Sequence, residues 1–291
     1  MKKIFILLIF CFELTGLNAQ ISNIDSLEAV LRNEKQDTTR ALLLNDLAYA
    51  YSMSKPEKAA PLVFEALELS RRIGFVKGEA KSLNMVAGRY NAMGNTPKAM
   101  ELLLQALKIN EKNNYLDGLS NNLGIIGSML HQMGDYRQAL RYHFKSKAIR
   151  EKLNNKQEIC MALGAIGATY RSLNILDSAR MFTQQAYDLA RQINYPRVMG
   201  TSLVRMGDIH AESGQNTLAL EYYRLSIPPM IKTGAGLSLT FLGMSRVFQK
   251  TGKLDSSLFY ASQSMAITRK RGALVIPEQS ALLYTIHKSK G

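Results

Sequence analysis

Cysteine is scarce in this sequence, which contains two cysteines among 291 residues. Cys11 lies in an apolar N-terminal segment that we expect to be removed, and Cys160 is then left without an intramolecular partner. A disulfide framework is therefore excluded for the mature chain, even in an oxidising compartment. Proline is also scarce, at seven residues, and 46% of the residues are hydrophobic, so we do not expect disorder over most of the length. Stability must come from packing.

The sequence also lacks the motifs of common catalytic chemistry. It has no glycine-rich phosphate loop, no nucleophile elbow and no Cys–His constellation. Its four histidines are spread along the chain, and none has a Cys, Asp or Glu at metal-ligand spacing on one helix face. We therefore predict no catalytic residue, no metal site and no cofactor, and we do not expect an enzyme.

Acidic residues are the minority among the charged ones, with 23 Asp and Glu against 37 Lys and Arg. A basic balance favours anionic partners, such as acidic proteins, nucleic acids or membrane surfaces. The basic residues are not interleaved with stacking aromatics, as they would be in a single-strand binder. Together with the export predicted below, this argues against nucleic acid, and we expect a protein or peptide partner.

The first nineteen residues differ from the rest of the chain. Two lysines precede an apolar run at residues 4–12, and Ala19 supplies a small residue before Gln20. This arrangement is typical of a secretory signal peptide that is cleaved before Gln20. A membrane anchor is the alternative, but spanning a bilayer takes roughly 20 apolar residues and Glu13 interrupts this run. We expect export to the periplasm, with no membrane span in the mature chain.

One interval dominates the remaining sequence. Alanines, other small residues and leucines each recur every forty residues. The positions are Ala59, Ala99, Ala139, Ala179 and Ala219, then Ala87, Gly127, Gly167 and Gly207, and finally Leu83, Leu123, Leu163 and Leu203. A period in this range indicates a solenoid, in which each repeat contacts mainly its neighbours.

Residues 120–152 show the repeating unit most clearly. Apolar residues at three- and four-residue spacing mark a first helix, Gly134 and Asp135 provide a turn and a helix cap, and a second helix is predicted from about residue 136 to residue 152. The inner side of this second helix is expected to hold Ala139, Leu140, Phe144 and Ala148. Small residues such as Gly127 permit the two helix axes to approach closely. Each unit is thus a helical hairpin.

The hairpin pattern resembles the tetratricopeptide repeat. The shared features are a leucine and a Leu-Gly-like pair in the first helix, a nearby aromatic residue, Gly-Asp at the turn and an alanine five residues after the glycine. Tryptophan is absent, and leucines such as Leu123 take its usual place. The period of forty is longer than the usual ~34 residues, as in the long repeats of kinesin light chains and bacterial peptide-responsive regulators. The resemblance implies an all-α, right-handed superhelical solenoid of stacked helical hairpins.

The resemblance also divides the chain into segments. A signal peptide at 1–19 and an N-terminal capping helix at 20–38 precede six repeats, at 39–74, 75–114, 115–154, 155–194, 195–234 and 235–272. Residues 273–291 form either a partial repeat of a longer protein or a C-terminal capping helix, because a stacked repeat needs a neighbour to bury its apolar side. Similar exported arrays often precede a membrane span and a cytoplasmic sensor kinase or regulator.

Hairpin arrays of this family bind ligands along a concave side, which is lined by the first helices. Carried over by repeat position, the resemblance places in that groove Asn84, Asn91, Asn121, Ser128, His131, Arg171, Arg205, Asp208, Glu212, Arg246 and Lys250. Arg171 and Arg205 are the expected anchors, because guanidinium groups make directional bonds to carboxylates and carbonyls. The alternative for Arg205 is a local pair with Asp208 at i+3.

We therefore expect an exported interaction module that binds a polypeptide in its groove, as the sensor or scaffold of a signalling system. A self-sufficient adaptor in envelope assembly is the alternative. A second surface is the basic stripe of Arg137, Arg141 and Lys145, which lie at i, i+4 and i+8 of one helix. This stripe is either a solvated face or a docking surface for an acidic partner.

Overall fold

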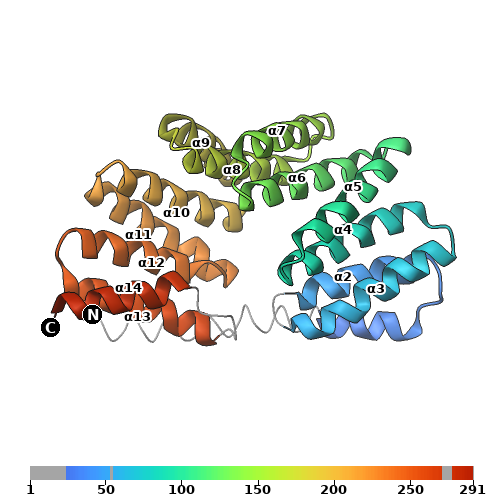
Figure 1. Cartoon of the computed structure of the whole chain (residues 1–291), viewed down its shortest axis with the longest axis horizontal. Coiled ribbons are helices and arrows are strands. Elements are labelled where there is room, and N and C mark those ends of the chain that lie inside the picture. Colours follow the sequence, from blue (N-terminus) through green and yellow to red (C-terminus); the bar gives the residue numbers. More distant parts are fainter. Residues whose placement is uncertain (1–23, 53–54, 271–276, 291) are drawn as a thin grey trace. The chain divides into compact units, whose positions relative to one another are not determined.

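The computed structural model describes residues 24–52, 55–270 and 277–290, and these residues are almost entirely helical, without a strand (Figure 1). The all-α fold predicted from the sequence is confirmed. The predicted signal peptide at 1–19 and the start of the segment 273–291 lie outside the described residues. None of the described helices is both long and apolar enough to cross a membrane.

The chain divides into two compact units, which we call the N-terminal unit (17–155) and the C-terminal unit (156–291). After a helical segment at 24–33, the N-terminal unit contains α2 (Thr38–Tyr51), α3 (Pro56–Arg72), α4 (Val76–Ala92), α5 (Thr96–Lys112), α6 (Leu116–Gln132) and α7 (Tyr136–Lys152). The C-terminal unit contains α8 (Lys156–Ser172), α9 (Leu176–Gln192), α10 (Pro196–Glu212), α11 (Asn216–Thr233), α12 (Leu237–Lys250), α13 (Leu254–Lys270) and α14 (Pro277–Lys290).

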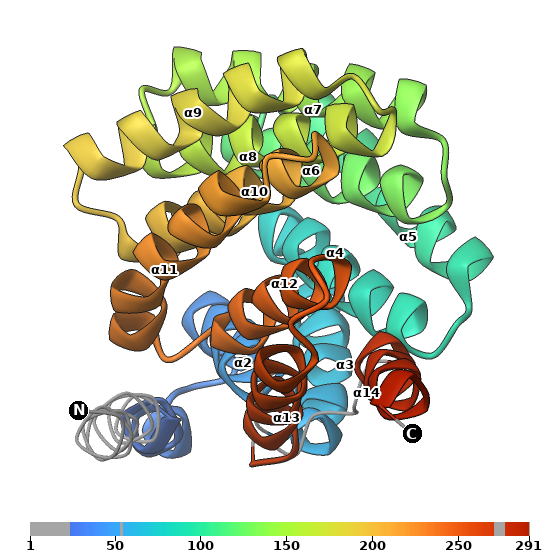
Figure 2. The same cartoon turned by 90° about the vertical axis from the view of Figure 1, so that its left-hand side faces the viewer.

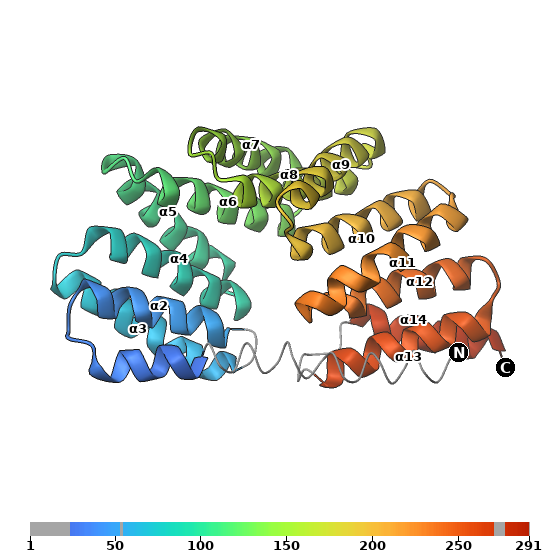
Figure 3. The same cartoon turned by 180° about the vertical axis from the view of Figure 1, so that it is seen from behind.

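Within each unit, the helices form hairpins that follow one another in chain order (Figures 2 and 3). Each even-numbered helix from α2 to α12 packs against the odd-numbered helix that follows it, and we call these the first and the second helix of a hairpin. First helices also contact each other directly, α4 with α2 and α6, and α10 with α8 and α12. The first helices of one unit therefore form a continuous surface.

Every turn residue with a left-handed backbone is glycine or asparagine within the described ranges. After first helices these residues are Gly94, Gly134, Asn174, Gly214 and Gly252, and between hairpins they are Gly74, Asn114, Asn154, Asn194, Gly234 and Gly236. Both residue types tolerate a positive φ, glycine because it has no Cβ and asparagine because its short side chain bonds locally. In the hairpin of α6 and α7, Asp135 caps α7 as predicted, accepting a hydrogen bond from the Gln138 N–H at 3.1 Å.

The inner side of α7 differs from the prediction. Ala139 is buried, but Phe144 is 36% exposed and Ala148 is exposed, so the assignment of these two residues to the core was wrong. The buried stripe instead continues through the polar residues His143, Ser146 and Arg150. The cause is found in the facing helix α6, where glycines leave space: a Cβ on Gly127 would lie 2.7 Å from His143 Nδ1, and one on Gly124 would lie 3.2 Å from Arg150 Nη2.

The C-terminal unit repeats this use of glycine around an aromatic ring. Tyr223 on α11 is 1% exposed. A Cβ on Gly207 of α10 would lie 2.6 Å from the Tyr223 ring, and one on Gly243 of α12 would lie 2.5 Å from it. Real Cβ contacts are not that short, so the ring occupies a slot that exists because two neighbouring first helices lack side chains there. Tyr223 thereby joins three helices of the C-terminal unit.

His143 gives the N-terminal unit a specific dependence on pH. The residue is 3% exposed, and burial lowers its pKa from 6.5 to about 4, with the charges of His131 and Arg150 acting in the same direction. Between these two values the unfolded chain binds a proton at His143 that the folded chain does not bind. Lowering the pH through this window therefore favours unfolding.

We expect His143→Gln to remove part of the acid sensitivity of the protein. In the parent protein, the contribution of His143 to stability should fall by at most about 3 kcal/mol between pH 6.5 and pH 4, as the shift implies. The measurement is urea denaturation at half-unit pH steps, with the variant compared to the parent because carboxylates also titrate there. Parallel stability curves for the two proteins would contradict the assignment.

Candidate binding site

Charged side chains gather on the first helices of the C-terminal unit. Arg171 lies near the end of α8, three residues lie on α10, and Arg246 lies on α12. We call the set of Arg171, Arg205, Asp208, Glu212 and Arg246 the arginine cluster. All five were predicted as groove residues, and the structure brings them together, since α10 contacts both α8 and α12. Their role in binding stays a prediction.

Asp208 is the centre of the arginine cluster. Its Oδ2 accepts a hydrogen bond from Arg171 Nη1 at 2.5 Å, and its Oδ1 accepts one from the Tyr223 hydroxyl at 2.7 Å. The Asp208 side chain is 16% exposed, whereas that of Arg171 is 31% exposed. Arg171 also lies 3.6 Å from a carboxylate oxygen of Glu212. Arg171 is therefore neutralised from two sides, and the slot-bound Tyr223 fixes the carboxylate that holds it.

Arg205 has a different environment from Arg171. It forms no hydrogen bond or salt bridge with any residue in the described part of the chain, so the local pair with Asp208 considered above is not formed. Its guanidinium lies against α8 at a position without a side chain, because a Cβ on Gly164 would be 3.1 Å from Arg205 Nη1. Burial lowers the pKa of Arg205, the charge of Arg171 lowers it further, and Asp208 offsets part of this effect.

The same charges influence the pKa values of two other groups at the site, Glu212 and Tyr223. Burial raises the pKa of Glu212, although Arg171 and Arg246 act in the opposite direction. Burial likewise raises the pKa of Tyr223, and the Asp208 carboxylate adds to this by its charge and its hydrogen bond. Arg246 is thus close enough to influence both groups. Tyr223 was not identified from the sequence, because it lies on a second helix at a position that otherwise reads as core.

The groove residues predicted in the N-terminal unit have other contacts. Asn84 is 7% exposed, and its Oδ1 accepts a hydrogen bond from Asn122 Nδ2 at 2.7 Å, so it ties α4 to α6 and is not presented to solvent as expected. Asn91 Nδ2 donates to Gln132 Oε1 at 3.1 Å. The other predicted residues lie on α6: Asn121 is exposed, Ser128 is exposed and donates to the Gly124 carbonyl at 3.0 Å, and the His131 ring meets Tyr136 edge-on at 5.2 Å.

Lys250, at the end of α12, was the last residue predicted for the groove. Its ammonium group donates a hydrogen bond to the Ala211 carbonyl of α10 at 3.3 Å, and the side chain is exposed. This contact lies between two neighbouring first helices of the C-terminal unit, like the bond between Arg171 and Asp208. Lys250 therefore adds a further positive charge to the same succession of helices.

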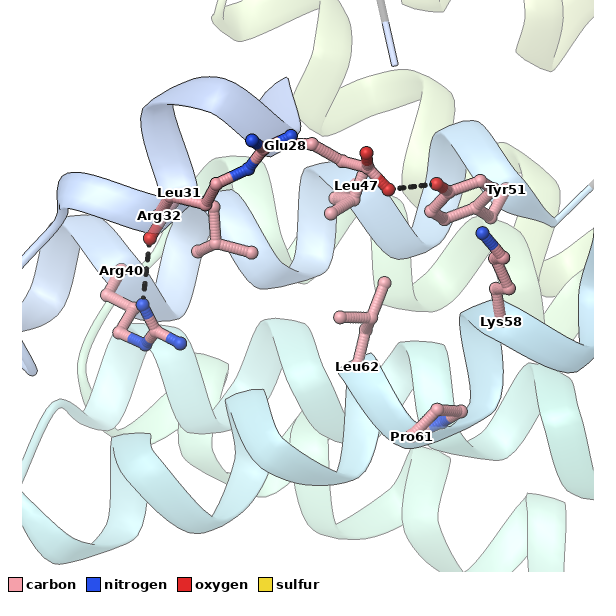
Figure 4. A pocket seen from close by; sticks show the side chains of 9 residues that line it. All are labelled: Glu28, Leu31, Arg32, Arg40, Leu47, Tyr51, Lys58, Pro61 and Leu62. Carbon is pink, nitrogen blue, oxygen red and sulfur yellow. Dashed lines mark hydrogen bonds between the residues drawn. The ribbon is translucent and has the colours of Figure 1, made fainter. Parts of the chain in front are cut away.

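The N-terminal unit contains a pocket that the sequence did not predict. It measures about 530 Å³ and lies between the helical segment 24–33, α2 and α3 (Figure 4). The Tyr51 hydroxyl donates a hydrogen bond to Glu28, and Arg40 Nη1 donates one to the Leu31 carbonyl at 2.9 Å. The bond to Glu28 raises the pKa of Tyr51 to about 12, with burial adding to it. These bonds attach the segment 24–33 to the first hairpin, so the pocket walls have a structural role.

Comparisons with known proteins agree with this architecture. Two models of the tetratricopeptide repeat match the chain, at residues 80–113 and at residues 119–192. These two stretches of the chain are therefore similar in sequence to tetratricopeptide repeats. A search of curated proteins found no match.

Solved structures with tetratricopeptide-like folds extend the similarity over most of the chain. A Rap protein complexed with competence and sporulation factor has a TM-score of 0.70 and 17% identity, covering 91% of this chain and 76% of that one. The apo form of RapI has a TM-score of 0.67 and 16% identity, covering 90% and 98%. Kinesin-light-chain-like repeats from Podosopora anserina have a TM-score of 0.52 and 17% identity, covering 67% and 97%. At these identities, the similarity concerns the fold.

Tetratricopeptide repeats typically act as non-enzymatic scaffolds for other proteins. Among the described residues, no group of three or more His, Cys, Asp or Glu is placed to hold a metal ion. Cys160 is fully buried, and burial raises the pKa of its thiol to about 11.

We expect Asp208→Asn to destabilise the C-terminal unit by about 1–3 kcal/mol, because it removes the charge that holds Arg171 and leaves the neighbouring arginines less compensated. The matched control is Asp188→Asn on α9, where the exposed carboxylate accepts, among the described residues, a hydrogen bond from Gln184 alone and the change should stay within about 0.5 kcal/mol. Urea denaturation of both variants measures the difference. Equal stabilities would show that the Asp208 contacts contribute little.

Proposed function

We propose that this protein is an interaction module that binds a polypeptide on the first helices of its C-terminal unit, at the arginine cluster. The observation that carries this proposal is the gathering of partly exposed charged side chains from α8, α10 and α12. The tetratricopeptide fold supports it, because such repeats are typically used for protein–protein interaction. A Rap protein of similar fold was solved with competence and sporulation factor bound.

The geometry of the C-terminal unit suits an elongated ligand. Its first helices contact each other in succession, so a single segment of polypeptide can engage α8, α10 and α12 together. The charge balance of residues 156–291, with 16 Lys and Arg against 8 Asp and Glu, favours a ligand with negative charge. Affinity is then spread over several repeats.

Photocrosslinking tests where a ligand binds. Peptides are selected from a displayed library of random sequences with the whole chain as bait. A photoreactive benzoylphenylalanine then replaces Glu212 or Arg246 at the cluster, which leaves the pair of Arg171 and Asp208 intact. Matched controls replace the exposed residues Met181 on α9 and Leu225 on α11. We expect the selected peptides to crosslink at positions 212 and 246 and not at the control positions.

Two results would count against this function. Failure to select any peptide would remove the evidence for polypeptide binding. Equal crosslinking from α9 or α11 would move the binding surface away from the first helices, and the basic stripe of Arg137, Arg141 and Lys145 on α7 would become the next candidate.

We further infer that the module is exported and serves as the sensor or scaffold of a signalling system. The pattern of residues 1–19 supports export, and the similarity of fold to Rap proteins supports a regulatory role. We expect the mature protein to begin at Gln20 and to be found outside the cytoplasm. Cell fractionation followed by N-terminal sequencing measures both, and a cytoplasmic product that retains Met1 would refute export.

A further inference from the structure

We propose that Arg205 is a preformed receptor for a carboxylate group of the bound polypeptide, supplied by an acidic side chain or by the C-terminus. This inference rests on the proposed polypeptide-binding function and specifies the chemistry of the ligand. It assigns different roles to the two arginines that the sequence had grouped as anchors. Arg171 belongs to the framework of the site, and Arg205 is the residue that contacts the ligand.

The first argument is the distribution of partners. The carboxylate of Asp208 is shared by Arg171 and the Tyr223 hydroxyl, at 2.5 and 2.7 Å, and Glu212 is also directed to Arg171, at 3.6 Å. Arg205, with five N–H donors, makes no hydrogen bond or salt bridge within the described ranges. Arg205 therefore keeps unused N–H donors on a side chain that remains partly exposed.

The second argument is the position of the guanidinium. Gly164 leaves the surface of α8 bare, and Arg205 Nη1 lies 3.1 Å from the point that a Cβ would occupy there. The Arg205 side chain thus crosses from α10 to α8 and rests against the neighbouring helix. A guanidinium held in this way loses less conformational entropy on binding than a free surface arginine.

A related arrangement in the N-terminal unit shows that a glycine beside an arginine is not sufficient. Gly124 stands one repeat before Gly164, and a Cβ there would lie 3.2 Å from Arg150 Nη2. Arg150 comes from the second helix α7 and is 7% exposed, so it fills the hairpin core. Arg205 comes from a first helix and keeps solvent access. The same type of space therefore serves packing within one hairpin and leaves an accessible donor between two others.

The third argument is charge. The arginine cluster contains three arginines and two carboxylates, so these five side chains carry a net charge of +1. Burial and the charge of Arg171 both lower the pKa of Arg205, which indicates that the free protein holds this charge unfavourably. A ligand with a single negative charge removes this penalty and can accept two parallel N–H bonds from the guanidinium. A doubly charged phosphate would exceed the available charge beside Asp208 and Glu212.

The first experiment uses acetate as the probe, because it supplies the carboxylate alone. The ¹⁵N-labelled Nε–H resonance of Arg205, assigned with Arg205→Lys, is followed during titration at constant ionic strength. We expect a saturable shift with acetate and no comparable shift with phosphate or chloride. Arg224 on α11 is the internal control, because it is exposed and also has no bonded partner in the described residues. Equal shifts of Arg205 and Arg224, or a response to phosphate alone, would overturn the proposal.

The second experiment uses the peptides obtained in the library selection. Each peptide is compared with analogues in which Asp and Glu are replaced by Asn and Gln, or in which the C-terminus is amidated. One of these changes should weaken binding to the parent protein at least about 10-fold, which is typical of a hydrogen bond to a charged group, and the analogue that does so identifies the source of the carboxylate. The same change should have little effect on binding to Arg205→Gln, whereas Arg224→Gln should behave as the parent protein.

The outcomes separate the two proposals. Peptides that bind at the cluster and keep their affinity without any carboxylate would refute the role of Arg205 and leave polypeptide binding intact. If acetate binds at Arg205 but no peptide is selected, the proposed polypeptide binding is refuted. The carboxylate-binding role of Arg205 then stands without it. Arg205→Gln should fold at least as stably as the parent, because Arg205 makes no hydrogen bond or salt bridge to any residue that the structure describes. If it does not fold, Arg205→Lys retains the positive charge and decides the comparison with the same peptides.

Discussion

The close approach of helices within and between hairpins is the constraint on which the rest of the structure depends. It is achieved by glycine or alanine at fixed positions of the repeat, where a larger side chain would push a neighbouring helix away. Gly127, Gly207 and Gly243 are examples, each facing a ring from a second helix. Packed protein interiors tolerate few voids, so every omitted side chain must be matched by one that fills the space. The identity of the filling residue then decides what each hairpin can do.

This constraint explains why polar residues are so common inside the hairpins. His143 and Tyr223 fill spaces that a leucine would fill in an ordinary helix pair, and both are nearly inaccessible to solvent. A buried polar group must find a partner or remain neutral. Tyr223 finds Asp208, whereas His143 has a lowered pKa and stays neutral. A ring packed against a glycine thus makes the stability of the N-terminal unit depend on pH. In the C-terminal unit, the same packing fixes the position of a carboxylate.

The sequence predicted the hairpins well because their signals are local. The cap at Asp135 and the bounds of α7 follow from the turn and the apolar stripe, both of which are visible within one repeat. The inner side of α7 was misjudged at Phe144 and Ala148, because hydrophobicity was weighed above the glycines of the facing helix. Asn114 was also overlooked as a left-handed turn residue, since asparagine has many other uses in a sequence.

The site was predictable only in part, for a related reason. Repeat position placed the five charged residues of the arginine cluster on first helices, and the structure brings these helices into contact. Which residues bond to each other depends on side-chain reach between helices, and spacing along one helix does not report it. Arg205 and Asp208 are favourably spaced at i+3, yet Asp208 bonds to Arg171, thirty-seven residues away. Tyr223 and the pocket beside Tyr51 likewise arise from contacts between helices.

The bond between Tyr223 and Asp208 has a consequence for how the C-terminal unit responds to a ligand. One end of this side chain is clamped between α10 and α12, and the other holds the carboxylate at the surface. A change in the charge around Asp208 is therefore transmitted to the packing of three helices by a single rigid ring. In thermodynamic terms, any ligand that binds this surface only in the folded state would stabilise the packing of the unit, as a cross-brace does. Substitution of Asp208 at the surface is correspondingly restricted by the packing of Tyr223 in the interior.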